Sequence, residues 1–328
     1  MSDVAVTERP VNNSLVTVFG GSGFLGRHVV RALAQRGYRI RVAVRRPQLA
    51  GFLRPMGGVG QVEPIQANVR FPDSVARAVA GADAVVNLVG ILGQSGRQKF
   101  DAVHVEGARD IAKAVAATGA RLVHVSAIGA DSSSPSGYGR SKGEGEAAIH
   151  AAVPDAVILR PSLLFGPDDD FFNRFASMAR ISPFLPLVGG GVTRFQPVFV
   201  ADVASVVQHA VDGHAKPGTI YELGGPEVRS FRELMELLQR EIGSTRGYLN
   251  LPFGLANFIA SLTQWVPGAP ITTDQVAMLR SDNVVSAAAQ AEGRDLSAFG
   301  ITPAAMSIVL PTYIWRFRKA GQFTHLEA

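Results

Sequence analysis

The chain has 328 residues, 47% hydrophobic and 18% charged, and its formal net charge is only +5. This length allows a full core in one large domain, or in one domain with a smaller lobe. The small charge, without Lys and Arg clusters interleaved with aromatic residues, argues against nucleic-acid binding. Cysteine is absent, which excludes disulfides and thiolate metal sites and suits a reducing compartment.

We expect a cytoplasmic protein. The N-terminal segment 1–13 contains Asp3 and Glu8 and lacks an apolar core, so it resembles neither a secretion signal nor a good transit peptide. No uninterrupted apolar run is long enough to span a bilayer. The histidines lack the spacing of metal ligands, so we expect no metal site.

The first half alternates apolar, strand-like runs with segments of helical periodicity. The predicted strands are Leu15–Phe19, Arg39–Val44, Gln61–Ala67, Ala84–Leu88, Leu122–Ser126 and Ala156–Leu159. The predicted helices are Phe24–Arg36, Pro72–Ala80, Lys99–Thr118 and Tyr138–Ala151. Gly37, Gly81 and Gly119 stand where three of these helices should end. This pattern predicts an α/β fold with a doubly wound parallel sheet.

After about Asp168 the alternation of strand-like and helical segments becomes less regular. A strand-like run, Gln196–Val200, meets a predicted helix, Asp202–Val211, that Asp202 is placed to cap. The last third mixes helices and loops, which predicts a small lobe over the C-terminal edge of the sheet.

The segment Val16–Gly26 contains the strongest functional motif. An apolar, β-branched run ends at Gly20, Gly23 and Gly26, in G-x-x-G-x-x-G spacing, and a predicted helix follows. The first glycine allows a tight turn, the second lets backbone N–H groups approach a diphosphate, and the third lets the helix pack closely on the strand. The helix N-terminus adds unpaired N–H groups and a positive dipole end.

This context predicts dinucleotide binding, and the alternative is a purely structural Gly-rich turn. The cofactor-binding residues expected in the turn are Gly20, Ser22, Gly23, Phe24, Leu25 and Gly26. Residues 14–225 would form the NAD(P)-binding Rossmann domain, with a substrate-lobe insertion near 168–195. Residues 226–328 would form a small C-terminal lobe packed on it.

Two arginines, Arg45 and Arg46, follow the second predicted strand, where dinucleotide sheets that bind NAD(H) carry an acid for the adenosine ribose. An arginine there favours an added 2′-phosphate, so the expected cofactor is NADP(H), with NAD(H) second. The alternative is a solvated pair of cations.

Two further strand ends should border the ligand crevice. After the third strand, Asn68 would hydrogen-bond the adenine while Val69 packs on it. After the fourth, Leu88, Val89 and Gly90 would line the path of the ribose and diphosphate. Each is only a strand end by itself, but together they follow the order that an extended dinucleotide requires.

Tyr138 and Lys142 are four residues apart and share one face of a predicted helix. The lysine ammonium would stabilise the phenolate and lower the pKa of the tyrosine, which makes it a proton donor or acceptor near neutral pH. Ser126, at the end of the fifth strand, is placed to hydrogen-bond a carbonyl oxygen.

Together these residues resemble the extended and atypical branches of the short-chain dehydrogenase/reductase superfamily, over about residues 15–231. The segment Leu159–Pro167 is similar to the family's R-P-x-x-x-x-G-P motif, and Pro197–Ala204 to its V-x-V-x-D-V-A motif. The resemblance implies that Tyr138 is the acid/base, that Lys142 orients it and binds the nicotinamide ribose, and that Ser126 polarises the substrate carbonyl. Tyr138, Lys142 and Pro161 are then also cofactor-binding residues.

A closer resemblance, over nearly the whole chain, is to bacterial relatives of the NADPH-binding accessory subunit of respiratory complex I. It is carried by Val123–Ala130, Asp169–Phe175, Thr193–Val198 and Thr312–Phe317. It implies a firmly held, structural NADPH, and respiratory complex I or ubiquinone-biosynthesis proteins as partners. It also implies peripheral membrane contact on the inner face of the cytoplasmic membrane.

One departure bears on catalysis. Where many reductases of the family carry an asparagine that helps a proton relay, this chain has His104. The histidine would either replace the asparagine in the relay or be an ordinary buried side chain, and the change weakens a simple dehydrogenase interpretation.

Two segments suggest contact surfaces. Leu251–Val266 carries no charge and would lie at an interface, cover an apolar quinone-like ligand, or form a buried helix. The aromatic and basic segment Tyr313–Lys319 would be a docking patch or ordinary packing of the lobe.

The favoured function is an NADP(H)-binding accessory or quinone-linked protein of the respiratory membrane system with a tightly held cofactor. One alternative is an active reductase, epimerase or dehydratase acting on a carbonyl substrate. Another is a regulator that senses the redox state of the nucleotide. The sequence leaves open whether the chain is an enzyme.

Overall fold

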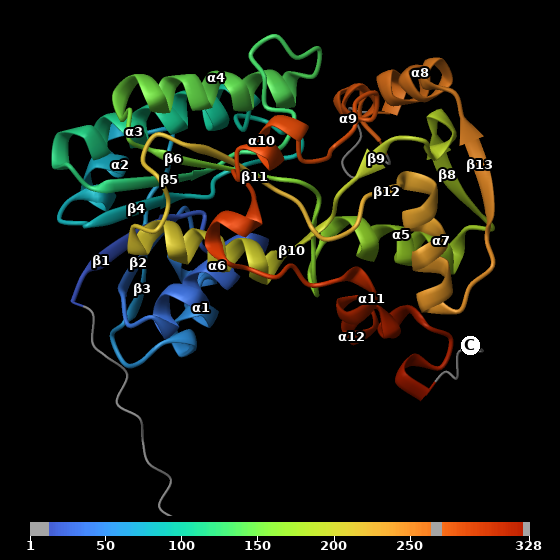
Figure 1. Cartoon of the computed structure of the whole chain (residues 1–328), viewed down its shortest axis with the longest axis horizontal. Coiled ribbons are helices and arrows are strands. Elements are labelled where there is room, and N and C mark those ends of the chain that lie inside the picture. The colour runs from blue at the N-terminus through green and yellow to red at the C-terminus, as the bar shows by residue number, and fades with distance from the viewer. Residues whose placement is uncertain (1–12, 264–270, 324–328) are drawn as a thin grey trace, which may run out of the picture.

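The structure is a computed structural model, and it describes residues 13–263 and 271–323. Its centre is a seven-stranded parallel sheet in the order β11-β6-β5-β4-β1-β2-β3 (Figure 1). The strands are β1 (Leu15–Phe19), β2 (Arg39–Val44), β3 (Val62–Gln66), β4 (Ala84–Asn87), β5 (Arg121–Val125), β6 (Val157–Pro161) and β11 (Ile220–Leu223). This confirms the predicted doubly wound α/β sheet.

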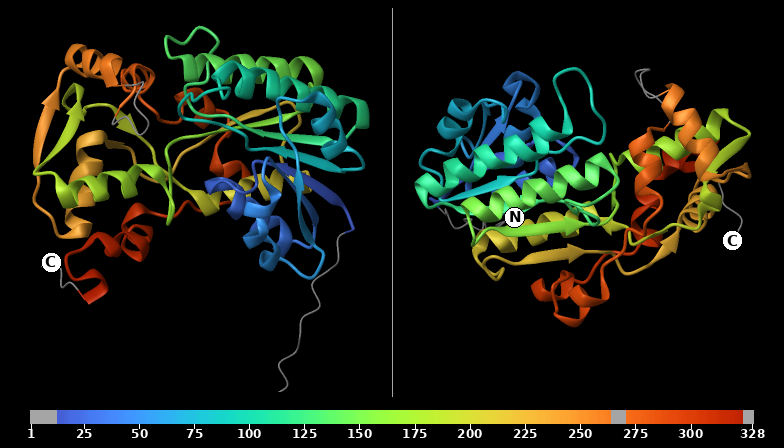
Figure 2. Two further views of the ribbon diagram at one scale, coloured as in Figure 1. Left: turned by 180° about the vertical axis from the view of Figure 1, so that it is seen from behind. Right: turned by 90° about the horizontal axis from the view of Figure 1, so that it is seen from above.

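Helices cover both faces of the sheet, which explains why its strands are nearly continuous apolar runs. The helices are α1 (Phe24–Gln35), α2 (Pro72–Val79), α3 (Glu106–Thr118), α4 (Gly137–Ala152) and α6 (Val200–Asp212). On β1, Val16 and Val18 join the core under α1 and α6, whereas Phe19 joins the core under α2, α3 and α4. Figure 2 shows the two helical layers on either side of the strands.

The order of the strands reverses at β1, which pairs with β2 on one side and β4 on the other. The connections that leave these strands run in opposite directions at their carboxyl ends, and this opens a crevice at a topological switch point. The predicted glycine turn follows β1 and therefore lies at that crevice.

Several predicted boundaries differ in detail. The predicted helix Lys99–Thr118 consists of a π-helical turn, Asp101–Val105, that continues into α3. The predicted strand Gln196–Val200 is replaced by two short strands, β9 (Arg194–Phe195) and β10 (Val198–Phe199).

The prediction that Asp202 caps a helix is wrong. Helix α6 begins at Val200, and Phe199 is its N-cap residue with extended backbone angles. Asp202 lies in the first turn, where its carboxylate accepts a hydrogen bond from the backbone N–H of Ala304 at 2.8 Å. The Asp202 carboxylate therefore binds the C-terminal segment and does not cap its own helix.

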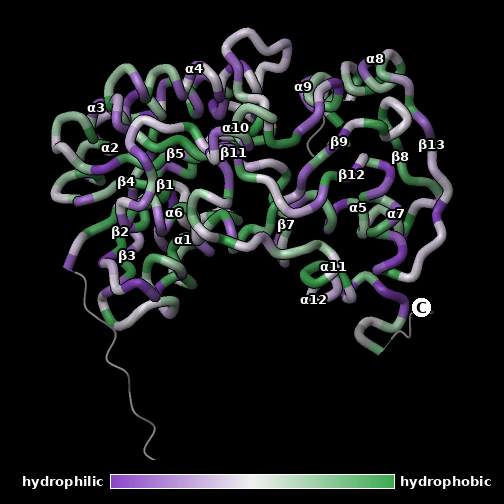
Figure 3. The backbone as a smooth tube through the Cα atoms, in the orientation of Figure 1, coloured by the Kyte–Doolittle hydropathy of each residue, from purple (hydrophilic) through white to green (hydrophobic). Residues whose placement is uncertain are grey.

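A second body, called the lobe below, packs beside the carboxyl edge of the sheet (Figure 2). Its elements are α5 (Asp170–Ile181), β8 (Phe184–Val188), α7 (Phe231–Ile242), β13 (Gly247–Leu251), α8 (Phe253–Thr263), α9 (Thr273–Met278), α11 (Met306–Val309) and α12 (Pro311–Ile314). Strands β8 and β13 pair in parallel, and Figure 3 shows hydrophobic residues along β8. The division of the chain at residue 225 stays a prediction.

Short elements connect the two bodies. They are β7 (Leu164–Phe165), which pairs with β10, β12 (Arg229–Ser230), which pairs with β9, and α10 (Ala287–Ala291). The 3-10 turns are Pro47–Leu49, Gly51–Met56, Gly189–Gly191, Leu296–Phe299, Trp315–Phe317 and Gly321–Phe323. Leu296 and Phe299 return to the core under α1 and α6, so the chain crosses between the bodies more than once.

The C-terminal segment is held by a buried polar contact. Asp169 caps α5 by accepting from the backbone N–H of Phe172 at 2.6 Å, and it also accepts from the Tyr313 hydroxyl at 2.6 Å. Arg316 donates to the backbone oxygen of Pro167 and to Asn173. Through these contacts, the aromatic and basic segment from Tyr313 to Lys319 packs against the start of α5 in the lobe.

Within the described ranges, 13–263 and 271–323, the structure contains no helix of sufficient length and apolarity to cross a membrane.

Candidate functional site

The turn after β1 is shaped by its glycines. Gly20 has φ +78°, a left-handed conformation, and a Cβ built there would lie 3.2 Å from the backbone carbon of Leu88. A Cβ on Gly26 would lie 2.3 Å from the backbone oxygen of Gly20, so only glycine allows the helix to pack this closely on the turn. Leu25 and Gly26 are buried, whereas Gly23 is exposed.

Helix α1 begins with an open N-terminus. Gly23 is its N-cap residue, and no side chain in the described parts of the chain caps the helix. Ser22 is half-buried in the turn, and Phe24 is the first helical residue. The free N–H groups and the positive dipole end point out of the sheet edge, which is the geometry that binds phosphate groups.

The two arginines after β2 are exposed. Gly20 donates a backbone hydrogen bond to Ala43 of β2 at 3.3 Å, so the end of β2 is adjacent to the glycine turn. The side chains of Arg45 and Arg46 make no hydrogen bond or ion pair with the residues that the structure describes. They are therefore available to an anion. Arg27, by contrast, pairs with Asp168 at 2.7 Å.

At the end of β3, Asn68 forms a local turn. Its side-chain oxygen accepts from the backbone N–H of Arg70 at 3.2 Å, and its backbone N–H donates to the Ser74 hydroxyl at 3.0 Å. Val69 packs against Gly107 of α3, where a Cβ would lie 3.0 Å from a Val69 methyl carbon. Both residues thus have fixed positions beside the crevice.

At the end of β4, the chain passes directly over Lys142. Leu88 and Val89 are half-buried, and Val89 donates its backbone N–H to the Asn87 side chain at 3.1 Å. A Cβ on Gly90 would lie 3.4 Å from Nζ of Lys142. The ammonium group therefore lies next to this strand end, at a distance where a Cβ would make an ordinary van der Waals contact.

Helix α4 supplies both members of the Tyr–Lys pair. Lys142 is 5% exposed, and its Nζ donates to the backbone oxygen of Val125 at 3.2 Å. Burial lowers the pKa of Lys142 to about 8, while nearby Glu146 acts in the opposite direction. The ammonium group is thus held against the end of β5, next to Ser126.

The direction of the Tyr138 pKa shift is opposite to the expected one. Burial raises the pKa of Tyr138 to about 12, and the negative charge of Asp274 adds to the increase. The lowering that the Tyr–Lys spacing predicts is absent from this arrangement, because Lys142 donates to Val125 instead. Tyr138 is therefore a phenol, and a proton donor, across the neutral pH range.

Ser126 presents an unpaired hydroxyl. It is 4% exposed, and its Oγ has no hydrogen-bond partner among the described residues. Its backbone N–H donates to Leu159 of β6 at 2.7 Å, which fixes the residue at the sheet edge. A buried polar atom without a partner is costly, so this hydroxyl is suited to a ligand oxygen.

His104 joins two sides of the site. Its Nε2 accepts from the backbone N–H of Ile91 at 3.0 Å, so its proton is on Nδ1, which lies 2.9 Å from the Ser141 hydroxyl. The ring stacks on Phe100 and meets Tyr138 edge-on at 5.5 Å. Burial, with the charge of Lys142, lowers the pKa of His104 to about 3. Both nitrogens are occupied and the ring is neutral, which fits a structural role rather than a proton relay.

His124 is a polar residue inside the apolar strand β5, and the apolar pattern of that strand does not explain it. It is buried in β5, and neither ring nitrogen has a hydrogen-bond partner among the described residues. Burial lowers its pKa far below the ordinary value, so the ring is neutral.

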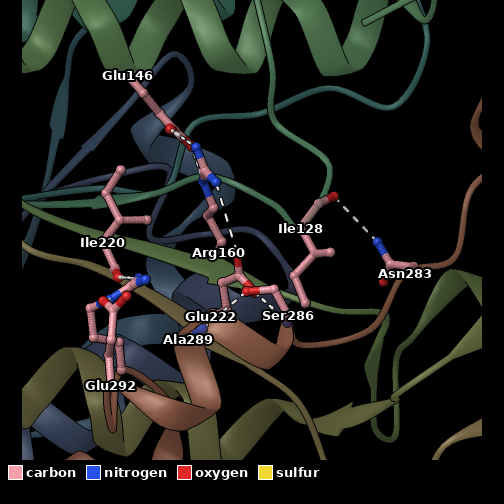
Figure 4. Close-up of polar contacts among 10 residues, drawn as sticks. Ile128, Glu146, Arg160, Ile220, Glu222, Asn283, Ser286, Ala289 and Glu292 are labelled. Carbon is pink, nitrogen blue, oxygen red and sulfur yellow. Dashed lines mark hydrogen bonds and ion pairs between the residues drawn. The ribbon is translucent and has the colours of Figure 1, made fainter.

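A partly buried ion network fixes α4 one turn beyond Lys142 (Figure 4). Arg160 of β6 donates to both carboxylate oxygens of Glu146, at 2.9 and 2.6 Å. Arg160 also lies 3.9 Å from Glu222 of β11, which accepts from the backbone N–H of Ser286 at 2.7 Å. The network therefore joins α4, the sheet and the segment that leads into α10.

Asn283, from the C-terminal third, links the loops at the ends of β5 and β6. Its side chain donates to the backbone oxygen of Ile128 at 3.3 Å (Figure 4). Its side-chain oxygen accepts from the Ser162 hydroxyl at 2.7 Å. Ser162 follows Pro161, which is buried at the end of β6. No local sequence signal marks Asn283, because its partners are distant in the chain.

The first turn of α4 also receives a carboxylate from the lobe. Asp274 of α9 accepts from the Ser136 hydroxyl at 3.1 Å and from the backbone N–H of Tyr138 at 3.2 Å. The sequence analysis missed this residue. The Thr272–Gln275 capping box predicts where α9 begins, but it does not identify the partner of Asp274.

The sheet brings the predicted site residues to one edge. In sheet order, Asn68 and Val69 follow β3, the two arginines follow β2, the glycine turn follows β1, Leu88–Gly90 follow β4, Ser126 follows β5, and Pro161 ends β6. Parallel strands place all of these carboxyl ends side by side. Within the described ranges, no group of three or more His, Cys, Asp or Glu residues is arranged to hold a metal ion.

Comparisons with known proteins agree with this arrangement. The model of the NAD dependent epimerase/dehydratase family matches residues 16–224. A mitochondrial protein of Arabidopsis thaliana, NADH dehydrogenase [ubiquinone] 1 alpha subcomplex subunit 9, is 35% identical over 84% of this chain and 72% of its own length. Ceramide reductase of Caulobacter vibrioides is 37% identical over 58% of this chain and 59% of its own length.

Among solved structures, gox2253 has a TM-score of 0.72 at 22% identity, and the alignment covers 95% of this chain and 100% of that one. This likeness supports the Rossmann-type fold. The family match over most of the sheet and the similarity to the mitochondrial subunit lead to one conclusion: the chain belongs to the NAD dependent epimerase/dehydratase family and is related to the complex I accessory subunit.

Proposed function

We propose that the chain binds NADP(H), in preference to NAD(H), along the carboxyl edge of its sheet. The observation that carries this proposal is the open N-terminus of α1. It is held close against the glycine turn, because a Cβ on Gly20 or Gly26 would crowd the backbone atoms of the neighbouring segments. Arg45 and Arg46, exposed and without partners among the described residues, suit a 2′-phosphate.

The remaining contacts follow the sheet order. Asn68 and Val69 would hold the adenine, and the segment Leu88–Gly90 would line the ribose and diphosphate. Lys142 would donate to the nicotinamide ribose with a second N–H of its ammonium group, while another N–H stays on the backbone oxygen of Val125. Pro161 would pack at the nicotinamide end.

Titration calorimetry of nucleotide-free protein with NADPH and NADH tests the proposal. Replacing both Arg45 and Arg46 by alanine should weaken NADPH binding about tenfold or more, because hydrogen bonds to charged groups contribute about 1.5–3 kcal/mol. NADH binding should be unchanged. Arg39→Ala, at the opposite end of the same strand, is the control. Absence of heat with either nucleotide would refute cofactor binding, and preference for NADH would refute only the arginine assignment.

For the biological role, we infer an accessory or quinone-linked protein of the respiratory membrane system with a tightly held cofactor, on the inner face of the cytoplasmic membrane. The similarity to the Arabidopsis subunit supports this inference. Its partners would be complex I or ubiquinone-biosynthesis proteins. Affinity purification from membranes in mild detergent tests it, since recovery of neither group of proteins would count against the role.

Helix α8 is the contact surface that we propose for this association. Ala256 and Ala260 are buried, whereas Leu255, Phe258 and Leu262 are about half exposed or more. The described part of the uncharged segment, up to residue 263, therefore forms a helix with one apolar face open. Phe258→Ser with Leu262→Ser should abolish recovery of the partners and leave NADPH affinity unchanged.

An active reductase is the second candidate, favoured by the unpaired Ser126 hydroxyl and the similarity to ceramide reductase. When bound, NADPH would supply a hydride to a carbonyl carbon. The Ser126 hydroxyl would donate to the carbonyl oxygen, and the Tyr138 phenol would transfer its proton to that oxygen, giving an alcohol and a tyrosinate. Lys142 would stabilise the tyrosinate before solvent reprotonates it.

Tyr138→Phe separates the two candidates. For a reductase, this variant should lose NADPH oxidation with ketone or quinone substrates while its NADPH affinity stays within about twofold. For an accessory protein, it should leave partner recovery unchanged. A redox-sensing role would require unequal affinities for NADPH and NADP⁺, and titration of the nucleotide-free protein with each of these two forms measures them.

A further inference from the structure

Helix α4 carries both Tyr138 and Lys142, so the position of its first turn decides where the phenol lies. The helix begins after Ser136, whose hydroxyl accepts from the backbone N–H of Gly139 at 3.1 Å. This local cap satisfies one of the free N–H groups at the helix end. The N–H of Tyr138 itself has a different partner.

That partner is a carboxylate from the lobe. The two oxygens of Asp274 lie 3.2 and 3.3 Å from the Tyr138 backbone nitrogen, and 3.1 and 3.2 Å from the Ser136 hydroxyl oxygen. A Cβ on Gly137 would lie 3.4 Å from one of these oxygens, an ordinary van der Waals distance, so the carboxylate lies directly against the helix end.

The contact is also electrostatic. Helix α4 has 16 residues, and its positive N-terminal end attracts a negative group. Ser136 donates to Asp274 and accepts from Gly139, so the two caps act as one unit. Asp274 is 136 residues from Tyr138 in the chain, and it holds the lobe helix α9 against this end of α4.

We propose that Asp274 is a positioning residue: through the N–H of Tyr138 and the Ser136 hydroxyl, the lobe sets where the Tyr138 phenol stands in the site. This inference rests on the proposed function, because it matters only if Tyr138 faces a ligand. Under this proposal, a lobe residue fixes the position of the acid/base side chain Tyr138, in addition to the lobe packing beside the crevice.

The charged and titratable groups around Tyr138 make the effect measurable. Lys142 is one turn away on the same helix, the neutral His104 ring lies against Tyr138 from the π-helical turn, Arg140 is near the same helix end, and Asp274 approaches from α9. Of these, Asp274 is the negative group, and with burial it raises the pKa of Tyr138. It therefore keeps the phenol protonated.

Asp274→Asn and Asp274→Ala separate the hydrogen bond from the charge. The asparagine keeps an acceptor oxygen and loses the charge, whereas the alanine loses both. Asp282→Asn is the matched control, because Asp282 also accepts a backbone N–H, that of Arg194, and its hydrogen bonds and ion pair among the described residues are with Arg194 rather than with α4. The Tyr138 pKa is followed by NMR of protein labelled at the tyrosine ring carbon that bears the hydroxyl, with Tyr138→Phe to assign the signal.

The proposal expects the Tyr138 pKa to fall in both Asp274 variants and to stay at its wild-type value in Asp282→Asn. Hydrogen exchange of the Tyr138 amide should accelerate about two- to thirty-fold in Asp274→Ala, the range that the loss of a helix cap gives. It should accelerate less in Asp274→Asn. If Asp274→Ala does not fold, the pKa and amide exchange of Asp274→Asn still decide the question.

An unchanged Tyr138 pKa in Asp274→Asn, with amide exchange equal to that of the control, would overturn the proposal. Failure of the proposed function has a different signature, since wild-type protein would then bind neither NADPH nor NADH in the calorimeter. The cap and pKa measurements do not depend on cofactor, so the two failures are distinguishable.

Discussion

The ammonium group of Lys142 donates a hydrogen bond to the backbone oxygen of Val125, 3.2 Å away, at the residue just before Ser126. One contact therefore ties the helix of the Tyr–Lys pair to the strand that carries the unpaired serine hydroxyl. A lysine held in this way is buried and partly desolvated, which lowers its pKa to about 8. The hydrogen bond to Val125 should therefore fix the position of the ammonium group.

Gly90→Ala should leave Lys142 in place. The new Cβ would lie 3.4 Å from Nζ, which is an ordinary van der Waals contact with the end of a flexible side chain. We expect the affinity for NADPH to stay within about twofold, or about 0.4 kcal/mol. Gly93→Ala, where a Cβ meets nothing within 4 Å, is the control in the same calorimetric titration. A loss of affinity of about fivefold or more relative to this control would contradict the prediction.

Gly26→Ala should destabilise the fold. Its Cβ would lie 2.3 Å from the backbone oxygen of Gly20, so α1 must move away from the turn, at a cost of about 1–3 kcal/mol. Urea unfolding measures the loss. Gly254→Ala, whose Cβ would meet nothing within 4 Å, should unfold at nearly the wild-type midpoint. A wild-type midpoint for Gly26→Ala would show that the turn relaxes freely.

The stability of the protein should depend on pH through His104. Burial lowers the pKa of His104 in the folded chain to about 3, from 6.5, so between these values the unfolded chain binds more protons. Stability should therefore be complete above pH 6.5 and fall as the pH drops toward 3, by up to about 1.4 kcal/mol per pH unit from this residue.

Urea unfolding at several pH values measures this slope, and His104→Asn should make it shallower. The neutral histidine also makes two hydrogen bonds, so the variant should be less stable at pH 7 by about 1–3 kcal/mol. The neutral His124 adds to the acid sensitivity and should keep part of the slope. An unchanged slope in His104→Asn would mean that this residue titrates normally.

Breaking the Arg160–Glu146 pair should be costly. Glu146 is buried, with a side-chain exposure of 5%, and Arg160→Ala would leave its charge without a partner, at a cost of about 3–5 kcal/mol for such pairs. Arg54→Ala, which breaks an exposed pair with Glu63, should cost less than about 1 kcal/mol. Thermal and urea unfolding compare the two, and similar losses would contradict the prediction.

Much of the architecture follows from short-range patterns. The glycine spacing after β1 and the four-residue spacing of Tyr138 and Lys142 each act within one turn of chain, where the backbone itself dictates the geometry. The alternation of apolar strands and amphipathic helices predicts a parallel sheet, and a parallel sheet places the carboxyl ends of all its strands at one edge. The predicted residues therefore lie in the order of an extended ligand.

The sequence by itself determined which residues end the strands, because the conformation of a short segment is encoded locally. Only the tertiary structure decided the order of the strands and what those residues touch. Asp202 is held by Ala304 rather than capping its helix, and Tyr138 meets the lobe carboxylate of Asp274. Those partners are more than 100 residues away, and a side chain's charge state depends on burial and on such neighbours, which no local pattern specifies.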